Sequence, residues 1–137
     1  MKLEILAATV LVSTICIAAP VKAENPAHVR QLLETGECAG CDLTKAGAHL
    51  IGADLRDANL KDANLADANL EGADLTGANL KGANLTQVFA SDASLNDTNL
   101  TGVNFTDAKL YSADLEGATL ADANFRGAKL SRANLSK

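Results

Sequence analysis

The chain has 137 residues, of which 47% are apolar but only 3% are aromatic, and it contains no tryptophan. This length suits one domain whose core is built from thin, repeated layers of Ala and Leu, because bulky anchors are scarce. The 12 basic and 17 acidic side chains give a net charge of −5, which argues against nucleic-acid binding by neutralisation of phosphates.

Residues 1–23 have the pattern of a secretory signal peptide. Lys2 precedes an apolar run over residues 5–19, and small residues at Val21 and Ala23 predict cleavage after Ala23. The run is shorter than the roughly 20 apolar residues of a membrane-spanning helix, so we expect no membrane span in the mature chain. Cys16 would be removed with this segment, and the protein would be exported.

Residues 24–47 are predicted to form a cap helix followed by a short Cys-containing segment. Asn25 is suited to cap the helix N-terminus, Pro26 to its first turn and Gly36 to its end. We expect the helix to cover the first layer of the core with an apolar stripe formed by Val29, Leu32 and Leu33.

The sequence Cys38-Ala39-Gly40-Cys41 has a spacing shared by disulfides, redox-active dithiols and zinc sites. A zinc site would need His28 and His49 to converge on the cysteines, and we expect both histidines at the surface instead. We favour a structural disulfide that ties the cap to the first layer, because disulfides are common in exported chains. No metal or other cofactor is expected.

From residue 48 to residue 137 the chain repeats every five residues, in 18 pentads without a gap. Fifteen of their central positions, counted from Leu50 to Leu135, carry Leu. The position two residues earlier, here called the alanine position, carries Ala in 15 pentads, and the residue between them is Asn or Asp in 12. A five-residue period fits neither a helix nor a straight strand, because both would scatter the central residues over opposite faces. The chain must therefore turn once in every pentad.

The position two residues after each central residue, here called the corner position, supplies the chemistry of that turn. It is mostly Gly, which accepts positive φ, or Asp, which can bond to nearby backbone. Four pentads would then close a square coil of 20 residues, with central and alanine positions inward and the others outward. The predicted inward ladder includes Leu55, Leu60, Leu65, Leu70, Leu75, Leu80, Leu85, Phe105 and Phe125.

The A-(N/D)-L-x-x signature, as in Ala58-Asn59-Leu60 and Ala73-Asp74-Leu75, resembles that of the pentapeptide-repeat proteins. The resemblance implies an all-β fold, a right-handed quadrilateral β-helix with its central residues stacked in ladders. Residues 32–43 also resemble the corresponding segment of exported cyanobacterial and thylakoid-lumen members. This second resemblance implies a location in the periplasm or the thylakoid lumen.

If residues 20 apart share a side, the pentads fall on four faces. Face one is formed by the pentads centred on Leu50, Leu70, Ala90, Leu110 and Leu130, and face two by those centred on Leu55, Leu75, Leu95, Leu115 and Leu135. Face four would stack Phe105 on Phe125. Between Leu43 and Leu55 the spacing is 12 residues instead of 10, which predicts a distorted loop over residues 45–49.

Face one interrupts the repeat, because Phe89 takes an outward position while the central residue beside it is Ala90. Tyr111 is predicted to point off the same face one coil later. Exposed aromatic pairs mark partner surfaces, so Phe89 and Tyr111 are candidates for an interaction site. The alternative is that Phe89 turns inward to fill the space beside Ala90.

No catalytic motif is present, and we interpret the chain as a non-enzymatic structural or protein-interaction module of an exported compartment. Its partner would be another protein, with weak self-association conceivable and the uncovered C-terminal end as a second candidate surface. Two alternatives stay open: a redox carrier that uses Cys38 and Cys41, and, implied by the family resemblance, a DNA-mimicking inhibitor of a DNA-binding enzyme. Acidic residues collect on face two, at Asp54, Asp57, Asp74, Asp97, Asp114 and Glu116.

Overall fold

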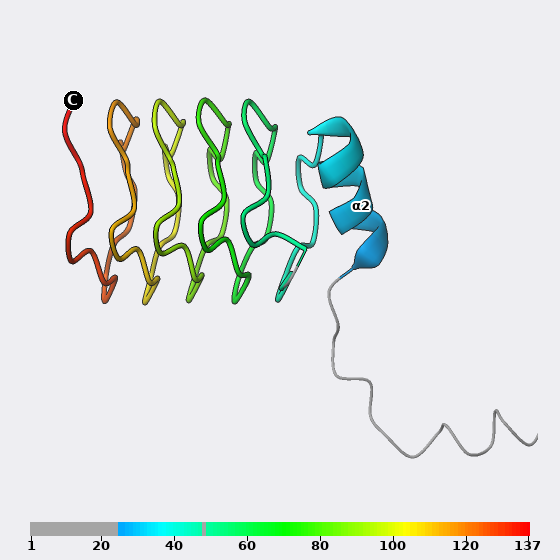
Figure 1. Ribbon diagram of the computed structural model, residues 1–137, viewed down its shortest axis with the longest axis horizontal. Coiled ribbons are helices and arrows are strands. Elements are labelled where there is room, and N and C mark those ends of the chain that lie inside the picture. The colour runs from blue at the N-terminus through cyan, green and yellow to red at the C-terminus, as the bar shows by residue number, and fades with distance from the viewer. Residues whose placement is uncertain (1–24, 48) are drawn as a thin grey trace, which may run out of the picture.

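The structure of the protein is a computed structural model, and it describes residues 25–47 and 49–137. A short helix lies at one end of a row of stacked coils, and the C-terminus lies at the other end (Figure 1). The predicted signal peptide and its Cys16 fall outside the described residues.

The helix, α2, spans Pro26–Thr35 and has the predicted start and stop. The Asn25 side chain accepts hydrogen bonds from the backbone N–H groups of Ala27 and His28, at 3.1 and 3.4 Å. Gly36 ends the helix at φ 70°, and its N–H donates to the carbonyl of Leu32 at 2.8 Å. Left-handed glycine is a common helix stop, since it has no Cβ to clash.

The apolar face of α2 is narrower than predicted. Val29 and Leu32 are buried and belong to the same core cluster as the coils. The prediction for Leu33 was wrong, because 44% of its surface is exposed. Successive helix positions are about 100° apart, so Leu32 and Leu33 do not share one buried face.

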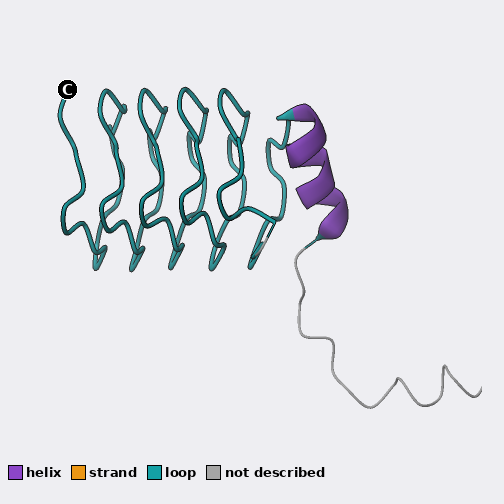
Figure 2. Ribbon diagram, in the orientation of Figure 1, coloured by secondary structure: helices purple, strands orange, loops and turns teal. Residues whose placement is uncertain are grey.

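Each coil contains four pentads, because parallel bridges join residues that are 20 apart, such as Asp54 to Asp74 and Asn59 to Asn79. Hydrogen bonds run in both directions across each step. Leu55 N–H donates to the Asp74 carbonyl at 2.7 Å, and Asp74 N–H donates to the Ala53 carbonyl at 3.0 Å. Each extended piece between corners is so short that the coils are drawn as loop throughout (Figure 2). The result is a β-helix whose backbone bonds connect successive coils.

Aspartate and glycine share one backbone conformation at the corners. Corner aspartates such as Asp57 lie at φ 54–59°, and corner glycines such as Gly77 lie at φ 63–72°. A Cβ placed on Gly77 would lie 2.4 Å from the Asp57 carboxylate oxygen of the previous coil. Glycine at this corner therefore supplies positive φ and also makes room for the aspartate stacked beside it.

The interior consists of ladders of central and alanine positions. Leu55, Leu60, Leu65, Leu70, Leu75, Leu80, Leu85 and Phe105 are at most 2% exposed. The larger residues at alanine positions, Val88, Thr98 and Val103, are also buried, and the Thr98 hydroxyl donates to the Leu75 carbonyl at 2.9 Å. Among the described residues, no buried side-chain nitrogen or oxygen lacks a hydrogen-bond partner.

The last coil is less well covered than the others. Phe105 and Phe125 stack with ring centroids 5.0 Å apart and planes inclined by 14°, which is the contact predicted on face four. Phe125 and Leu120 are only partly buried, however, and Leu135 is 44% exposed. Ladder residues need a coil on both sides, so burial declines towards this end.

The first coil is incomplete and contains the predicted two-residue slip. Its bridges join residues 22 apart, Glu37 to Asn59 and Asp42 to Asn64, instead of 20. Ala46 still follows the longer register, since its carbonyl accepts from Asn69 N–H at 2.8 Å. By Gly52, whose N–H donates to the Glu71 carbonyl at 2.8 Å, the regular spacing is restored. The extra residues therefore lie between Ala46 and Gly52, where Leu50 N–H donates to the Gly47 carbonyl at 3.0 Å.

Candidate functional site

Cys38 and Cys41 form a disulfide inside the incomplete first coil. In the 22-residue register Cys38 aligns with the central Leu60 and Cys41 with Ala63, so both cysteines occupy inward positions. They are 0% and 5% exposed, and Cys41 N–H donates to the Cys38 carbonyl at 3.1 Å, as at other corners. The disulfide therefore links two residues at one corner of the coil. The expectation that it would tie the helix to the coil was wrong, because neither cysteine lies in α2.

His28 provides that connection. Its Nδ1 accepts from the backbone N–H of Asp42 at 3.0 Å, and its carbonyl lies 3.4 Å from the Cys38 sulfur. The prediction of a solvent-facing His28 was wrong, since it is half-buried between α2 and the first coil. His49 is exposed. Within residues 25–47 and 49–137, no group of three or more His, Cys, Asp or Glu side chains is arranged to hold a metal ion.

We expect both cysteines to resist alkylation in the native protein, because neither sulfur is a free thiol. The tryptic peptide covering residues 31–45 should carry no label before reduction, and two labels after denaturation and reduction. Loss of the disulfide in the double variant Cys38→Ala/Cys41→Ala should lower the free energy of unfolding by about 2 kcal/mol, as the loop-entropy model gives for so short a loop. Complete labelling of the untreated protein would contradict the structural role.

Two acidic side chains of face two, those of Asp54 and Asp74, lie beside Arg56. Arg56 contacts the Asp54 carboxylate through two nitrogens, at 2.7 and 2.5 Å, and lies 3.8 Å from Asp74. Hydrogen bonds from Arg56 hold the pKa of Asp54 at about 2. Hydrogen bonds from Thr76 lower the pKa of Asp74. These carboxylates stay ionised and paired, so they lack the raised pKa that a general acid needs at neutral pH.

Phe89 and Tyr111 are both exposed on face one, at 41% of their surface each. The neighbouring Lys109 places its Nζ 3.9 Å from the centroid of the Phe89 ring. Lys109 lies one coil beyond Phe89 in the same column, and a parallel bridge joins their backbones. This cation–π contact was missed from the sequence, although the 20-residue spacing between the two residues was available to predict it.

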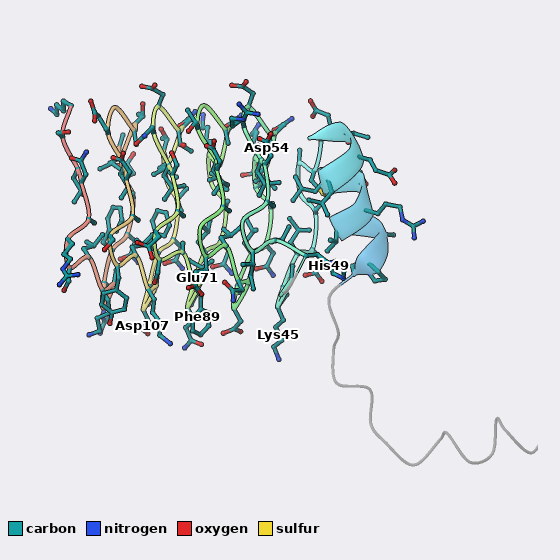
Figure 3. The ribbon with its side chains drawn as sticks, viewed as in Figure 1. Lys45, His49, Asp54, Glu71, Phe89 and Asp107 are labelled. Carbon is teal, nitrogen blue, oxygen red and sulfur yellow. A yellow bond between two sulfur atoms is a disulfide. The ribbon has the colours of Figure 1, made fainter. Side chains whose placement is uncertain are left out.

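A shallow hollow of about 290 Å³ adjoins the Phe89 ring, and four of its five lining residues have polar or charged side chains. Glu71, Phe89 and Asp107 lie along one side of the solenoid, while Asp54 lies on the opposite side (Figure 3). The residues that line the hollow are Asp67, Gln87, Phe89, Asp107 and Lys109.

The proposed inward turn of Phe89 is not seen. Ala90 is 1% exposed, and the adjoining alanine position carries Val88, which is fully buried. Valine supplies apolar volume next to the small Ala90, so the interior does not require the Phe89 ring. The replacement of alanine by Val88 was the sequence signal for this outward orientation.

Among the residues that the structure describes, no helical segment has the length and apolar character of a membrane crossing.

A family model described as pentapeptide repeats matches residues 46–82, 78–117 and 108–137, in eight copies. The sequence has no significant match among curated proteins.

Several solved structures are similar to this chain. A pentapeptide repeat protein of the Arabidopsis thaliana thylakoid lumen is 28% identical with a TM-score of 0.47, and the match covers 83% of this chain and 74% of that one. Rfr23, from the cyanobacterium Cyanothece 51142, is 26% identical with a TM-score of 0.50, over 80% of this chain and 93% of that one. QnrB1, a plasmid-mediated fluoroquinolone resistance protein, is 17% identical with a TM-score of 0.50, over 73% and 68%, a likeness of fold alone.

Proposed function

Because the chain belongs to the pentapeptide-repeat family, we propose that it is a non-enzymatic protein-interaction module whose face one contacts another protein. The observation that carries the proposal is the exposure of Phe89 and Tyr111 at outward positions. The interior does not need either ring, and exposed aromatics in an otherwise polar repeat are enriched at protein interfaces. The outward asparagines instead form hydrogen bonds with nearby backbone. The Asn84 side-chain oxygen, for example, accepts from Thr86 N–H at 3.1 Å.

We infer that the coil is quadrilateral and right-handed, and that α2 caps its first layer. Four pentads per 20-residue step support four sides, and the family resemblance supports the hand. Burial of Val29 and Leu32 within the core cluster supports the capping role. A cap here would shield the first ladder residues and the unpaired backbone of the first coil.

We also propose that the protein is exported, with residues 1–23 as its signal peptide and the periplasm or the thylakoid lumen as its compartment. The apolar run over residues 5–19 and the small residues Val21 and Ala23 support this proposal. A disulfide between Cys38 and Cys41 is compatible with an oxidising compartment.

The two alternative functions have less support. A redox carrier must let a thiolate attack its disulfide, and the sulfurs of Cys38 and Cys41 are enclosed by α2 and the first coil. A DNA mimic needs a continuous anionic surface, whereas Arg56 interrupts the acidic residues of face two. Neither alternative is therefore preferred to a protein contact through face one.

The double variant Phe89→Ser/Tyr111→Ser should capture at least tenfold less partner protein than the wild type, because it lacks the apolar anchors of the surface. The measurement is affinity capture of protein partners from the protein's own compartment. The melting temperature of the double variant should stay close to that of the wild type, since both rings lie outside the core.

A matched control is a second double variant, Leu33→Ser/Leu135→Ser, compared with the wild type and with Phe89→Ser/Tyr111→Ser. These residues are each 44% exposed, close to the 41% of Phe89 and Tyr111, but they lie on α2 and in the last coil. The control should keep the partners of the wild type. Equal capture by all three proteins would remove the support for face one.

A further inference from the structure

We propose that face one also pairs with face one of a second copy of this chain, with the two solenoids running antiparallel. The inference rests on the proposed function, since it uses the same surface and names a partner for it. It comes from the order of charges and aromatics along face one, whose coils are counted here from Leu50 in the first to Leu130 in the fifth.

Charges near face one change sign along the solenoid axis. In the second coil Asp67 and Glu71 are exposed, in the third and fourth coils Asp92, Asp107 and Lys109 are exposed, and in the fifth coil Lys129 and Arg132 are exposed. The surface thus runs from acidic through mixed to basic. Parallel bridges place Asn69, Phe89, Lys109 and Lys129 in one continuous column, so these coils are consecutive layers of a single surface. Phe89 and Tyr111 lie in the third and fourth coils, between the acidic and the basic ends.

An antiparallel pair satisfies this order. The two-fold axis of this pair lies in the plane of the interface, perpendicular to the solenoid axis and between the third and fourth coils. It places the second coil of each copy on the fifth coil of the other. Glu71 then lies opposite Ser131 of the second copy, with Lys129 and Arg132 of that copy on either side. Phe89 lies opposite Lys109 of the second copy, which repeats across the interface the cation–π contact that exists within the chain at 3.9 Å.

The parallel alternative is electrostatically unfavourable. A two-fold axis along the solenoid would place every coil on its own copy, so that Asp67 and Glu71 meet the same two acids. Lys129 and Arg132 would likewise meet the same two bases. Juxtaposition of like charges opposes association, whereas opposite charges fix the register of a self-complementary interface.

The predicted interface is small. Four overlapping coils at strand spacing give a contact roughly 19 Å long, which places it at the low end of interface sizes. We therefore expect a weak dimer that depends on protein concentration and dissociates in high salt, since its ion pairs are exposed at the rim.

Sedimentation equilibrium between about 10 µM and 1 mM protein, a range suited to weak dimers, tests this proposal. Glu71→Lys and Lys129→Glu, each alone, should raise the dimer Kd at least tenfold, because like charges then meet twice in each dimer. A 1:1 mixture of the two variants should return to within about threefold of the wild-type Kd, because each supplies the charge that the other lacks. The control reversals Glu116→Lys on face two and Lys81→Glu on face three should leave the Kd unchanged. Face three is formed by the pentads centred on Leu60, Leu80, Leu100 and Leu120.

A wild-type protein that stays monomeric up to about 1 mM would overturn the self-pairing. So would a mixture of Glu71→Lys and Lys129→Glu that associates no more tightly than either variant alone. Neither result affects the capture of another protein through Phe89 and Tyr111, which tests the proposed function separately. Conversely, a dimer with the predicted charge dependence, but with partner capture unaffected by Phe89→Ser/Tyr111→Ser, would support self-pairing and contradict the wider function.

Discussion

Replacement of Phe105 by Ala is expected to lower the free energy of unfolding by about 3–5 kcal/mol, the range observed for aromatic truncations in protein cores. Phe105 is fully buried and stacks on Phe125 at 5.0 Å, so its removal leaves a cavity inside the ladder and also deletes the ring contact. Chemical denaturation followed by circular dichroism would measure the change.

The other two phenylalanines provide matched controls, because the same substitution is made in different surroundings. Phe125→Ala should have an intermediate effect, since Phe125 lies in the last coil and is only partly buried. Phe89→Ala should cost about 1 kcal/mol or less, mostly through loss of the exposed contact with Lys109. A cost for Phe89→Ala equal to that for Phe105→Ala would show that the Phe89 ring is part of the core.

Replacement of Ala78 by Leu is expected to lower the free energy of unfolding by roughly 1–3 kcal/mol through overpacking. Ala78 occupies an alanine position, is 1% exposed, and accepts a hydrogen bond from Asn99 N–H at 3.0 Å through its carbonyl. A larger side chain at this position would press on the Leu ladder and strain the bonds between coils.

Ala121→Leu is the matched control for Ala78→Leu, because Ala121 is exposed at an outward position of its pentad. It should change the free energy of unfolding by no more than about 0.5 kcal/mol, as is usual at the surface. Equal denaturation midpoints for the two variants would contradict the assignment of inside and outside positions.

The sequence was sufficient to predict the repeat, its four pentads per coil and the positions that face inward. A five-residue period keeps the apolar residues together only if the chain turns in every pentad. Gly or Asp two residues after most central residues supplies that turn. The spacing between Leu43 and Leu55 likewise predicted the irregular first coil. The bridges of Glu37 to Asn59 and of Asp42 to Asn64, each 22 residues apart, confirm that irregularity.

The first coil and the helix were predicted less well, because each of their contacts occurs once and no repeat constrains them. The sequence placed Cys38 and Cys41 near the helix but could not indicate that both replace inward residues of a single corner. The roles of His28 and Leu33 depend on how α2 lies on the coil. Phe89 was ambiguous for a different reason: its orientation depends on whether Val88 fills the space beside Ala90, which is a question of packing and not of pattern.

The assignment of face one as the contact surface is tested most directly by photo-crosslinking in the protein's own compartment, with a photoreactive phenylalanine analogue at position 89. The same analogue at Lys81, exposed on face three, is the control. A contact through face one predicts a discrete crosslinked product from position 89 and none above background from position 81. No product from position 89, or equal products from both positions, would contradict it.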